Sequence, residues 1–233
     1  MTSLILTKLL FNSLDTQGYV IGANTDNYTA VAIDSSNNIY AGGNRELGDK
    51  DFLMVKYSVA GIQGVVASID PNPGLDDSVE KIIFDSNNDL YLVGNEDRSL
   101  SRVVIVKTNT SGTLDTSFSG DGIAYFKMSS GLEPEYAIVV SDAVIDSNDN
   151  IVVVGSSSIN LAKRTKMLGR IKPDGNLDSD FDSTGYYRSS NCANNANLES
   201  IVLLNNSSFV VAGQCYQNVI SLRDLHISHF TMN

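Results

Sequence analysis

Asp34-Ser-Ser-Asn-Asn-Ile-Tyr-Ala-Gly-Gly43 is the first of four related segments in this chain. The others are Asp85-Ser-Asn-Asn-Asp-Leu-Tyr-Leu-Val-Gly94, Asp146-Ser-Asn-Asp-Asn-Ile-Val-Val-Val-Gly155 and a divergent copy, Leu204-Asn-Asn-Ser-Ser-Phe-Val-Val-Ala-Gly213. Each segment places Asp, Ser and Asn residues between two short apolar runs, which is the pattern of a β-hairpin. The closing glycine suits a close approach of two backbones. The copies recur at intervals of roughly 50 to 60 residues, which is typical of the blades of a β-propeller.

Two further elements repeat between these hairpins. An apolar run that ends in Lys, Arg or His occupies residues 4–8, 52–56, 103–107, 166–170 and 225–229. An element that begins with Leu-Asp occupies residues 14–16, 114–118 and 177–181. With these elements, each unit holds four short strands, and no segment has the sustained 3.6-residue apolar period of a helix. The predicted strands are 3–10, 17–23, 28–34, 38–43, 51–58, 63–69, 78–85, 89–95, 102–109, 122–127, 137–146, 150–155, 165–172, 184–190, 198–204, 208–214 and 224–232.

The predicted fold is all-β, a β-propeller of about four four-stranded blades with an extra strand at the termini. We expect one domain over residues 1–233, with repeat units at about 3–44, 51–95, 102–155 and 165–214 and a partial unit at 224–233. No convincing signal peptide opens the chain, so we expect a fragment of a longer exported protein.

Closure of the ring leaves one strand surplus. Either residues 17–23 complete the last blade beside 224–232 and leave 3–10 without a place, or 3–10 take that position and displace 224–232. An unpaired apolar strand invites pairing with another chain. We therefore expect that the surplus strand is either docked elsewhere or shared between subunits. Of these we favour a homo-oligomer through terminal strand exchange, with a monomer as the alternative.

The Leu-Asp elements resemble the delta-60 repeat family of bacterial β-propellers. Leu114-Asp-Thr-Ser-Phe-Ser-Gly-Asp-Gly122 is similar to that family's Leu-Asp-x-Ser-Phe-x-Gly-Asp-Gly signature, and Lys172-Pro-Asp-Gly175 also fits. Residues 61–74 lack the signature. The resemblance implies a propeller within a large exported or cell-surface bacterial protein, and it implies no chemistry because a fold does not determine a function.

The charge balance excludes two classes of partner. Sixteen Lys and Arg face 27 Asp and Glu, which gives a formal net charge of −11. Nucleic acids and anionic membranes both require clustered cations, so we expect neither as a partner. No apolar run approaches the roughly 20 residues of a membrane-spanning helix, so we expect no membrane insertion.

Two acidic loops have the spacing of calcium ligands, namely Asp85-x-Asn87-x-Asp89 and Asp146-x-Asn148-x-Asn150. Both lack the glycine and the bidentate Glu of such loops, so we interpret them as ordinary hairpin turns. His226 and His229 point to opposite faces of a strand, which favours a structural role. We expect no metal and no cofactor.

Catalysis finds little support. The carboxylate pairs Asp76–Asp77 and Glu133–Glu135 could perform glycosidic chemistry if they were buried and correctly separated. They lie in polar loops, however, and we expect a solvated surface. We therefore predict that the chain is not an enzyme.

A ligand-binding face is predicted where the loops after the hairpins meet. These loops carry arginines, and the longest also carries a tyrosine and two amides: Arg45, Arg98, Arg164, Arg223, Tyr216, Gln217 and Asn218. Such residues suit a polar ligand, a glycan or a protein. The alternative is that the arginines pair with nearby acids. The favoured function is a non-catalytic recognition or adhesion module of a bacterial surface or fibre protein; a carbohydrate-active enzyme and a structural spacer are the alternatives.

The two cysteines, Cys192 and Cys215, fall at the same end of adjacent predicted strands. A disulfide between them is geometrically reachable. It would indicate an oxidising compartment, which agrees with an extracellular or cell-surface location.

Overall fold

The computed structural model describes residues 26–96, 102–128, 137–160, 163–189, 192, 195–205, 208–216 and 223–231. These residues form strands and turns and contain no helix, as the sequence predicts. The first sheet contains β1 (Asp26–Ile33), β2 (Ile39–Glu46), β3 (Lys50–Tyr57) and β4 (Gln63–Ile69). The second contains β5 (Asp77–Phe84), β6 (Leu90–Glu96), β7 (Val103–Thr108) and β8 (Ile123–Phe126). The third contains β9 (Ala137–Ile145), β10 (Ile151–Asn160), β11 (Lys163–Ile171) and β12 (Tyr186–Ser189), and the fourth contains β13 (Ala196–Asn205), β14 (Ser208–Tyr216) and β15 (Arg223–Thr231).

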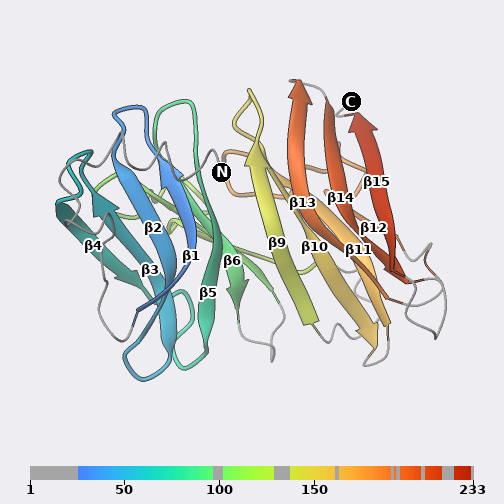
Figure 1. Cartoon of the computed structure of the whole chain (residues 1–233), viewed down its shortest axis with the longest axis horizontal. Coiled ribbons are helices and arrows are strands. Elements are labelled where there is room, and N and C mark those ends of the chain that lie inside the picture. Colours follow the sequence, from blue (N-terminus) through green and yellow to red (C-terminus); the bar gives the residue numbers. More distant parts are fainter. Residues whose placement is uncertain are drawn as a thin grey trace.

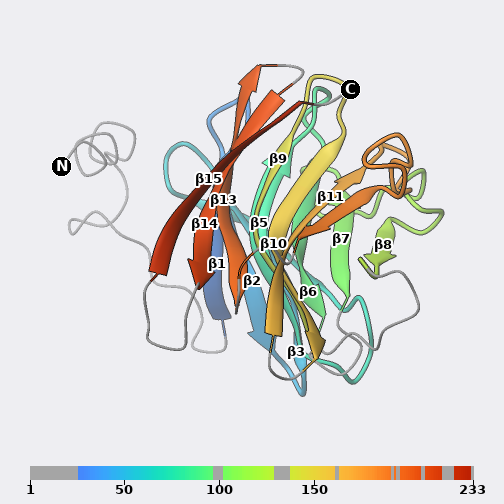
Figure 2. The ribbon, with the colours of Figure 1, turned by 90° about the vertical axis from the view of Figure 1, so that its right-hand side faces the viewer.

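The four antiparallel sheets stand in a row in chain order (Figure 1). β5 contacts the first sheet, β9 contacts the second and β13 contacts the third. An apolar core fills each of the three junctions, and strands of both neighbouring sheets contribute to it. Figure 2 views this row from the end that carries β13, β14 and β15.

The predicted hairpin turns are built alike. The Oδ1 atoms of Asp34, Asp85 and Asp146 each accept hydrogen bonds from the backbone N–H groups two and four residues later. The fourth residue of each turn adopts a positive φ of 60–66° and is Asn or Asp, the residues that best tolerate this conformation. The repeated Asp-Ser-Asn segment thus encodes a turn, as expected.

Hydrogen bonds join these turns from sheet to sheet. The N–H and hydroxyl of Ser35 donate to Asn88, and those of Ser86 donate to Asp149. Equivalent turns therefore lie side by side along one edge of the row.

The glycine that ends each hairpin segment is required by a close approach of backbones. A Cβ atom at Gly43, Gly94 or Gly155 would overlap a carbonyl oxygen of the preceding strand. That strand carries a β-bulge opposite each of these glycines. The repeated glycine is therefore a consequence of the bulge.

The Leu-Asp element holds the chain against the preceding strand. The N–H groups of Asp115 and Asp178 donate to the carbonyl oxygens of Lys107 and Arg170, at 2.9 and 2.8 Å. Their side chains also pair, with Lys107 Nζ 3.0 Å from Asp115 and Arg170 Nε 2.6 Å from Asp178. The basic residue and the Leu-Asp element therefore form one structural unit.

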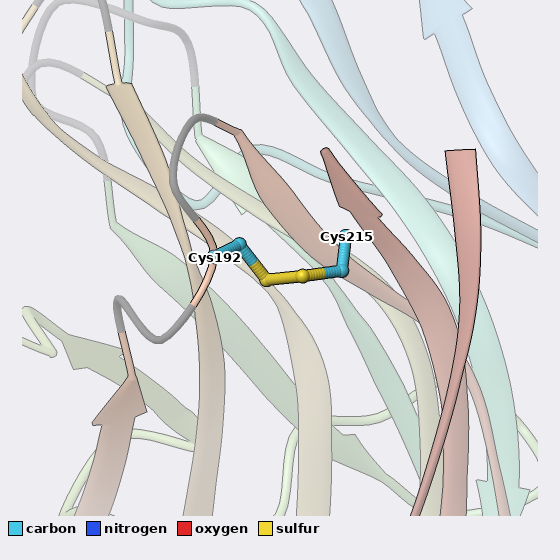
Figure 3. Close-up of a disulfide and its surroundings, with 2 residues drawn as sticks. All are labelled: Cys192 and Cys215. Atoms are coloured by element: carbon cyan, nitrogen blue, oxygen red, sulfur yellow. A yellow bond between two sulfur atoms is a disulfide. The ribbon is translucent and has the colours of Figure 1, made fainter. Parts of the chain in front are cut away.

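The disulfide prediction is confirmed. Cys192 and Cys215 are bonded, with their Cα atoms 5.5 Å apart (Figure 3). Both are buried, together with Ala196. The bond ties the segment before β13 to the end of β14.

The described sheets form an open row, with the first and last sheets at opposite ends (Figure 1). The fourth sheet has three strands in this part of the chain. The predicted strands 3–10 and 17–23 lie outside the described residues, so ring closure and strand exchange stay predictions. Among the described residues, no helix has the length and apolarity needed to cross a membrane.

Candidate functional site

A cavity of about 470 Å³ opens where three sheets meet. It lies at the edge of the row opposite the Asp-Ser-Asn turns, because its lining comes from the end of β2, the ends of β5 and β6 that are remote from their turn, and the first residues of β9 and β11. Its polar lining comprises Asn44, Lys50, Asp76, Asp77, Ser78, Glu80, Asn95, Glu96 and Arg164. Ala137, Ile138 and Val139 supply the apolar wall.

Asp77 is the most unusual group in this cavity. Asp77 is 1 % exposed, and neither carboxylate oxygen has a partner with ordinary hydrogen-bond geometry among the described residues, although the backbone N–H of Asn72 acts to lower its pKa. Burial raises the pKa of Asp77 to about 7, and the negative charges of Glu96, Asp70 and Asp51 add to the effect. The carboxyl group can therefore donate or accept a proton near neutral pH.

Glu96 lies directly opposite Asp77 in the β5–β6 pair. It is buried, and it receives hydrogen bonds from Arg102, at 2.7 Å for the Nη2 to Oε1 bond, and from the Asn72 amide. The hydrogen bond to Glu96 raises the pKa of the Arg102 guanidinium, which also stacks on the Tyr125 ring with its central carbon 4.3 Å from the ring centroid. Glu96 is thus paired with a cation, whereas Asp77 forms no ion pair within the described chain.

Polar contacts fix the sheets around the cavity. Asn44 donates to the Ser78 hydroxyl at 3.4 Å, and the Val140 N–H donates to the Asn95 oxygen at 2.8 Å. Lys50 pairs with Asp76 at 3.0 Å. Burial raises the pKa of Glu80. The result is an acidic floor with amide and hydroxyl groups beside it.

The predicted binding residues are only partly brought together. Arg164 lines the cavity, and its backbone N–H donates to Asn195 at 2.8 Å. Arg45 lies outside the lining and forms a two-bond ion pair with Asp26, as the alternative interpretation of these arginines states. The Tyr216 hydroxyl donates to Gln214 at 3.0 Å, and Tyr216 also lies outside the lining.

Several predicted residues fall outside the description. Arg98, Gln217, Asn218, Glu133 and Glu135 belong to undescribed segments. Arg223 begins β15, but its side chain is not described, and the same holds for the side chains of His226 and His229 in that strand.

The solvated interpretation of the Asp76–Asp77 pair is wrong for Asp77. Asp76 is exposed and pairs with Lys50, whereas Asp77 begins β5 and is buried. A comparison of the repeat units in the sequence could have identified Asp77 as unusual. Asp26 faces Arg45 across β1 and β2, but the equivalent residue Asp77 faces Glu96 across β5 and β6. An acid has replaced the cation.

The acidic loops that resemble calcium sites are hairpin turns. The Lys107 ammonium lies 3.3 Å from Asp85, 3.7 Å from Asp89 and 3.0 Å from Asp115. A cation of the chain itself therefore sits beside the Asp85 turn. That this turn binds no calcium stays a prediction.

One acidic cluster in the described chain has oxygens close enough to share an ion. The carboxylates of Asp49, Asp51 and Asp70 lie within 4.8 Å of one another. The Gly74 N–H donates to Asp49 at 2.6 Å, and the Ser68 hydroxyl donates to Asp51 at 3.5 Å. We assign no ion to this cluster.

Comparisons with known proteins find a likeness at the level of the fold. No family model matches the chain, and no curated protein matches it. A protein of unknown function from Dyadobacter fermentans aligns with a TM-score of 0.55 at 7 % identity, covering 87 % of this chain and 52 % of that one. An arabinanase from Bacillus subtilis aligns at 0.47 with 14 % identity, covering 87 % and 70 %.

The tail fibre of Staphylococcus aureus phage P68 aligns with a TM-score of 0.32 at 11 % identity, covering 100 % of this chain and 56 % of that one. The aligned part of this chain spans about half the length of the Dyadobacter protein, 52 %. The comparisons show an arrangement of sheets shared with that protein, and they show no family.

Proposed function

We propose that this chain is part of a β-propeller, with the described sheets as its blades, and that it is a non-catalytic module that recognises a glycan. The delta-60 resemblance supports the propeller, as does the stacking of four small sheets. The disulfide supports a location outside the cell, where such bonds persist.

The observation that carries the ligand proposal is the buried carboxyl group of Asp77 in the cavity, which has no side-chain partner among the described residues. A buried polar group without a partner is costly, and a ligand that supplies a hydroxyl donor removes this cost. The volume of about 470 Å³ is within the usual range for small-ligand sites. Asn44, Asn95 and Ser78 supply donors and acceptors for further hydroxyl groups.

A glycan array followed by calorimetry tests this proposal. We expect binding by the wild type and at least tenfold weaker binding by Asp77→Ala and Asn95→Ala, because each removes a polar group of the lining. Arg45→Ala is the matched control, since Arg45 lies in β2 at the position that Glu96 occupies in β6, but it pairs with Asp26 outside the cavity. Absence of glycan binding, or equal loss in the Arg45 variant, would contradict the proposal. If the chain instead bound a protein through the loops around the cavity, the ligand would be a protein and the glycan proposal would be wrong.

Glycosidic hydrolysis is the second candidate function. One observation favours it: Asp77 and Glu96 face each other, and only Glu96 is paired with a cation. In glycosidases, a difference in surroundings of this kind separates the carboxyl group that acts as the acid from the one that acts as the base. Against it, Glu96 is already occupied by Arg102 and Asn72. We therefore expect no release of reducing sugar from any glycan that binds; release that is lost in both Asp77→Asn and Glu96→Gln would favour the enzyme.

A further inference from the structure

The outer face of the fourth sheet carries an exposed apolar stripe. Val202 on β13 is 56 % exposed and Ile227 on β15 is 63 % exposed. Val202 pairs across the strands with Val210, and Ala212 pairs with Ile227. Paired residues share a face of a sheet, so these four side chains form one continuous stripe.

The same stripe exists on the second sheet, where it is buried. In the register of the repeat, the equivalent residues are Ile83 paired with Tyr91, and Val93 paired with Ile105. All four belong to the core between the second and third sheets.

The third sheet repeats the arrangement. Val144 pairs with Val152, and Val154 pairs with Leu168. These residues belong to the core between the third and fourth sheets. The stripe on the fourth sheet is therefore the surface with which each earlier sheet packs against the sheet that follows it.

The opposite surface is exposed at the other end of the row. Val31 and Ile33 on β1 are 69 % and 51 % exposed. Their equivalents in the second sheet, Ile82 and Phe84, belong to the core shared with the first sheet. On this side of the first sheet Leu53 and Val55 are already buried, so the open part lies over β1.

We propose that the stripe on the fourth sheet is an interface for a second copy of this chain, whose first sheet packs on it through β1. In such a contact β1 takes the part that β5, β9 and β13 play in the three junctions within the chain. It joins two different surfaces, so it is a head-to-tail contact that either closes into a ring or continues. This contact packs sheet faces and needs no exchange of strands. It also leaves the ligand proposal untouched, because none of these residues lines the cavity.

Light scattering coupled to size-exclusion chromatography tests the interface. We expect the wild type to show a mass at least twice the 25.1 kDa of one chain at high concentration. Ile227→Glu and Val202→Glu should each shift the mass to that of a monomer. Ile62→Glu is the matched control, because Ile62 is also 69 % exposed but lies in the turn between β3 and β4. A wild type that is monomeric at every concentration, or an assembly that both stripe variants retain, would overturn the proposal.

Cysteine cross-linking tests the head-to-tail geometry without destabilising charges. Both native cysteines are bonded to each other, so an introduced cysteine is the sole free thiol. We expect Val31→Cys mixed with Ile227→Cys to form a cross-linked dimer on oxidation, whereas each variant alone forms none. Cross-linking of Ile227→Cys to itself with no product in the mixture would refute the proposed pairing.

Discussion

Replacement of Lys107 by Met tests whether the basic residue of the repeat is a structural cation. Lys107 is buried, and its ammonium lies 3.0 Å from Asp115 and 3.3 Å from Asp85. Met keeps most of the apolar stem but leaves the buried Asp85 without its counter-charge. Removing one partner of a buried ion pair costs about 3–5 kcal/mol of stability, so we expect a loss of that size in the free energy of unfolding.

Lys50→Met is the control for this substitution. Lys50 and Asp76 form a pair of similar length, 3.0 Å, but their side chains are 43 % and 48 % exposed. Exposed pairs contribute about 0–1 kcal/mol, so this variant should unfold almost as the wild type does. Urea denaturation at pH 7, followed by circular dichroism, measures both variants. An equal loss in the two would refute the reasoning that burial makes the Lys107 pair important.

The pH dependence of the same variant gives a second readout. Hydrogen bonds from Ser117 and Lys107 lower the pKa of Asp115 to about 2. A carboxyl group with a lowered pKa in the folded state stabilises the protein above its unfolded pKa of 3.8, and this stability is lost as the pH falls towards 2. In Lys107→Met the loss between pH 4 and pH 2 should be smaller, because only the Ser117 bonds remain.

Three further substitutions follow from particular contacts. Asp77→Asn should raise the free energy of unfolding at pH 8 by up to about 4 kcal/mol, since each pKa unit between 3.8 and about 7 corresponds to about 1.4 kcal/mol. The raised pKa means that ionisation opposes folding, so this gain should shrink as the pH falls from 7 to 4, and identical pH profiles for variant and wild type in urea denaturation would contradict it. Serine at both Cys192 and Cys215 should cost about 3.5 kcal/mol for a sequence separation of 23 residues, measured by denaturation under oxidising conditions; an unchanged midpoint would count against a stabilising disulfide. Gly94→Ala should lower the melting temperature by several degrees because its Cβ would overlap a backbone oxygen, whereas Gly64→Ala, which meets only an ordinary contact at 3.7 Å, should not, and equal melting temperatures would refute the assigned role.

The residues of the candidate site could be predicted only in part from the individual sequence segments. Arg164 was among the predicted ligand-binding residues and does line the cavity. The sequence predicts a solvated surface for Asp77, because the Asp76–Asp77 pair lies in a polar loop. Its burial comes from the second sheet packing between its neighbours, which no local pattern records.

The amino-acid sequence by itself determines the turns, the strands and the disulfide, because these depend on residues that are close in the chain. Asp and Asn at fixed offsets form the turns by bonding their own backbone, apolar alternation supplies the strands, and the two cysteines fall at neighbouring strand ends. Each of these features depends on contacts within one repeat unit. The cavity, the burial of Asp77 and the exposed stripe of Val202 and Ile227 depend instead on how the sheets stack. Stacking brings residues as distant as Asn44 and Arg164 to one cavity and leaves the same apolar face buried in one sheet and open in another. Only the tertiary structure decides these features, because the free energy of a side chain there depends on the neighbouring sheet.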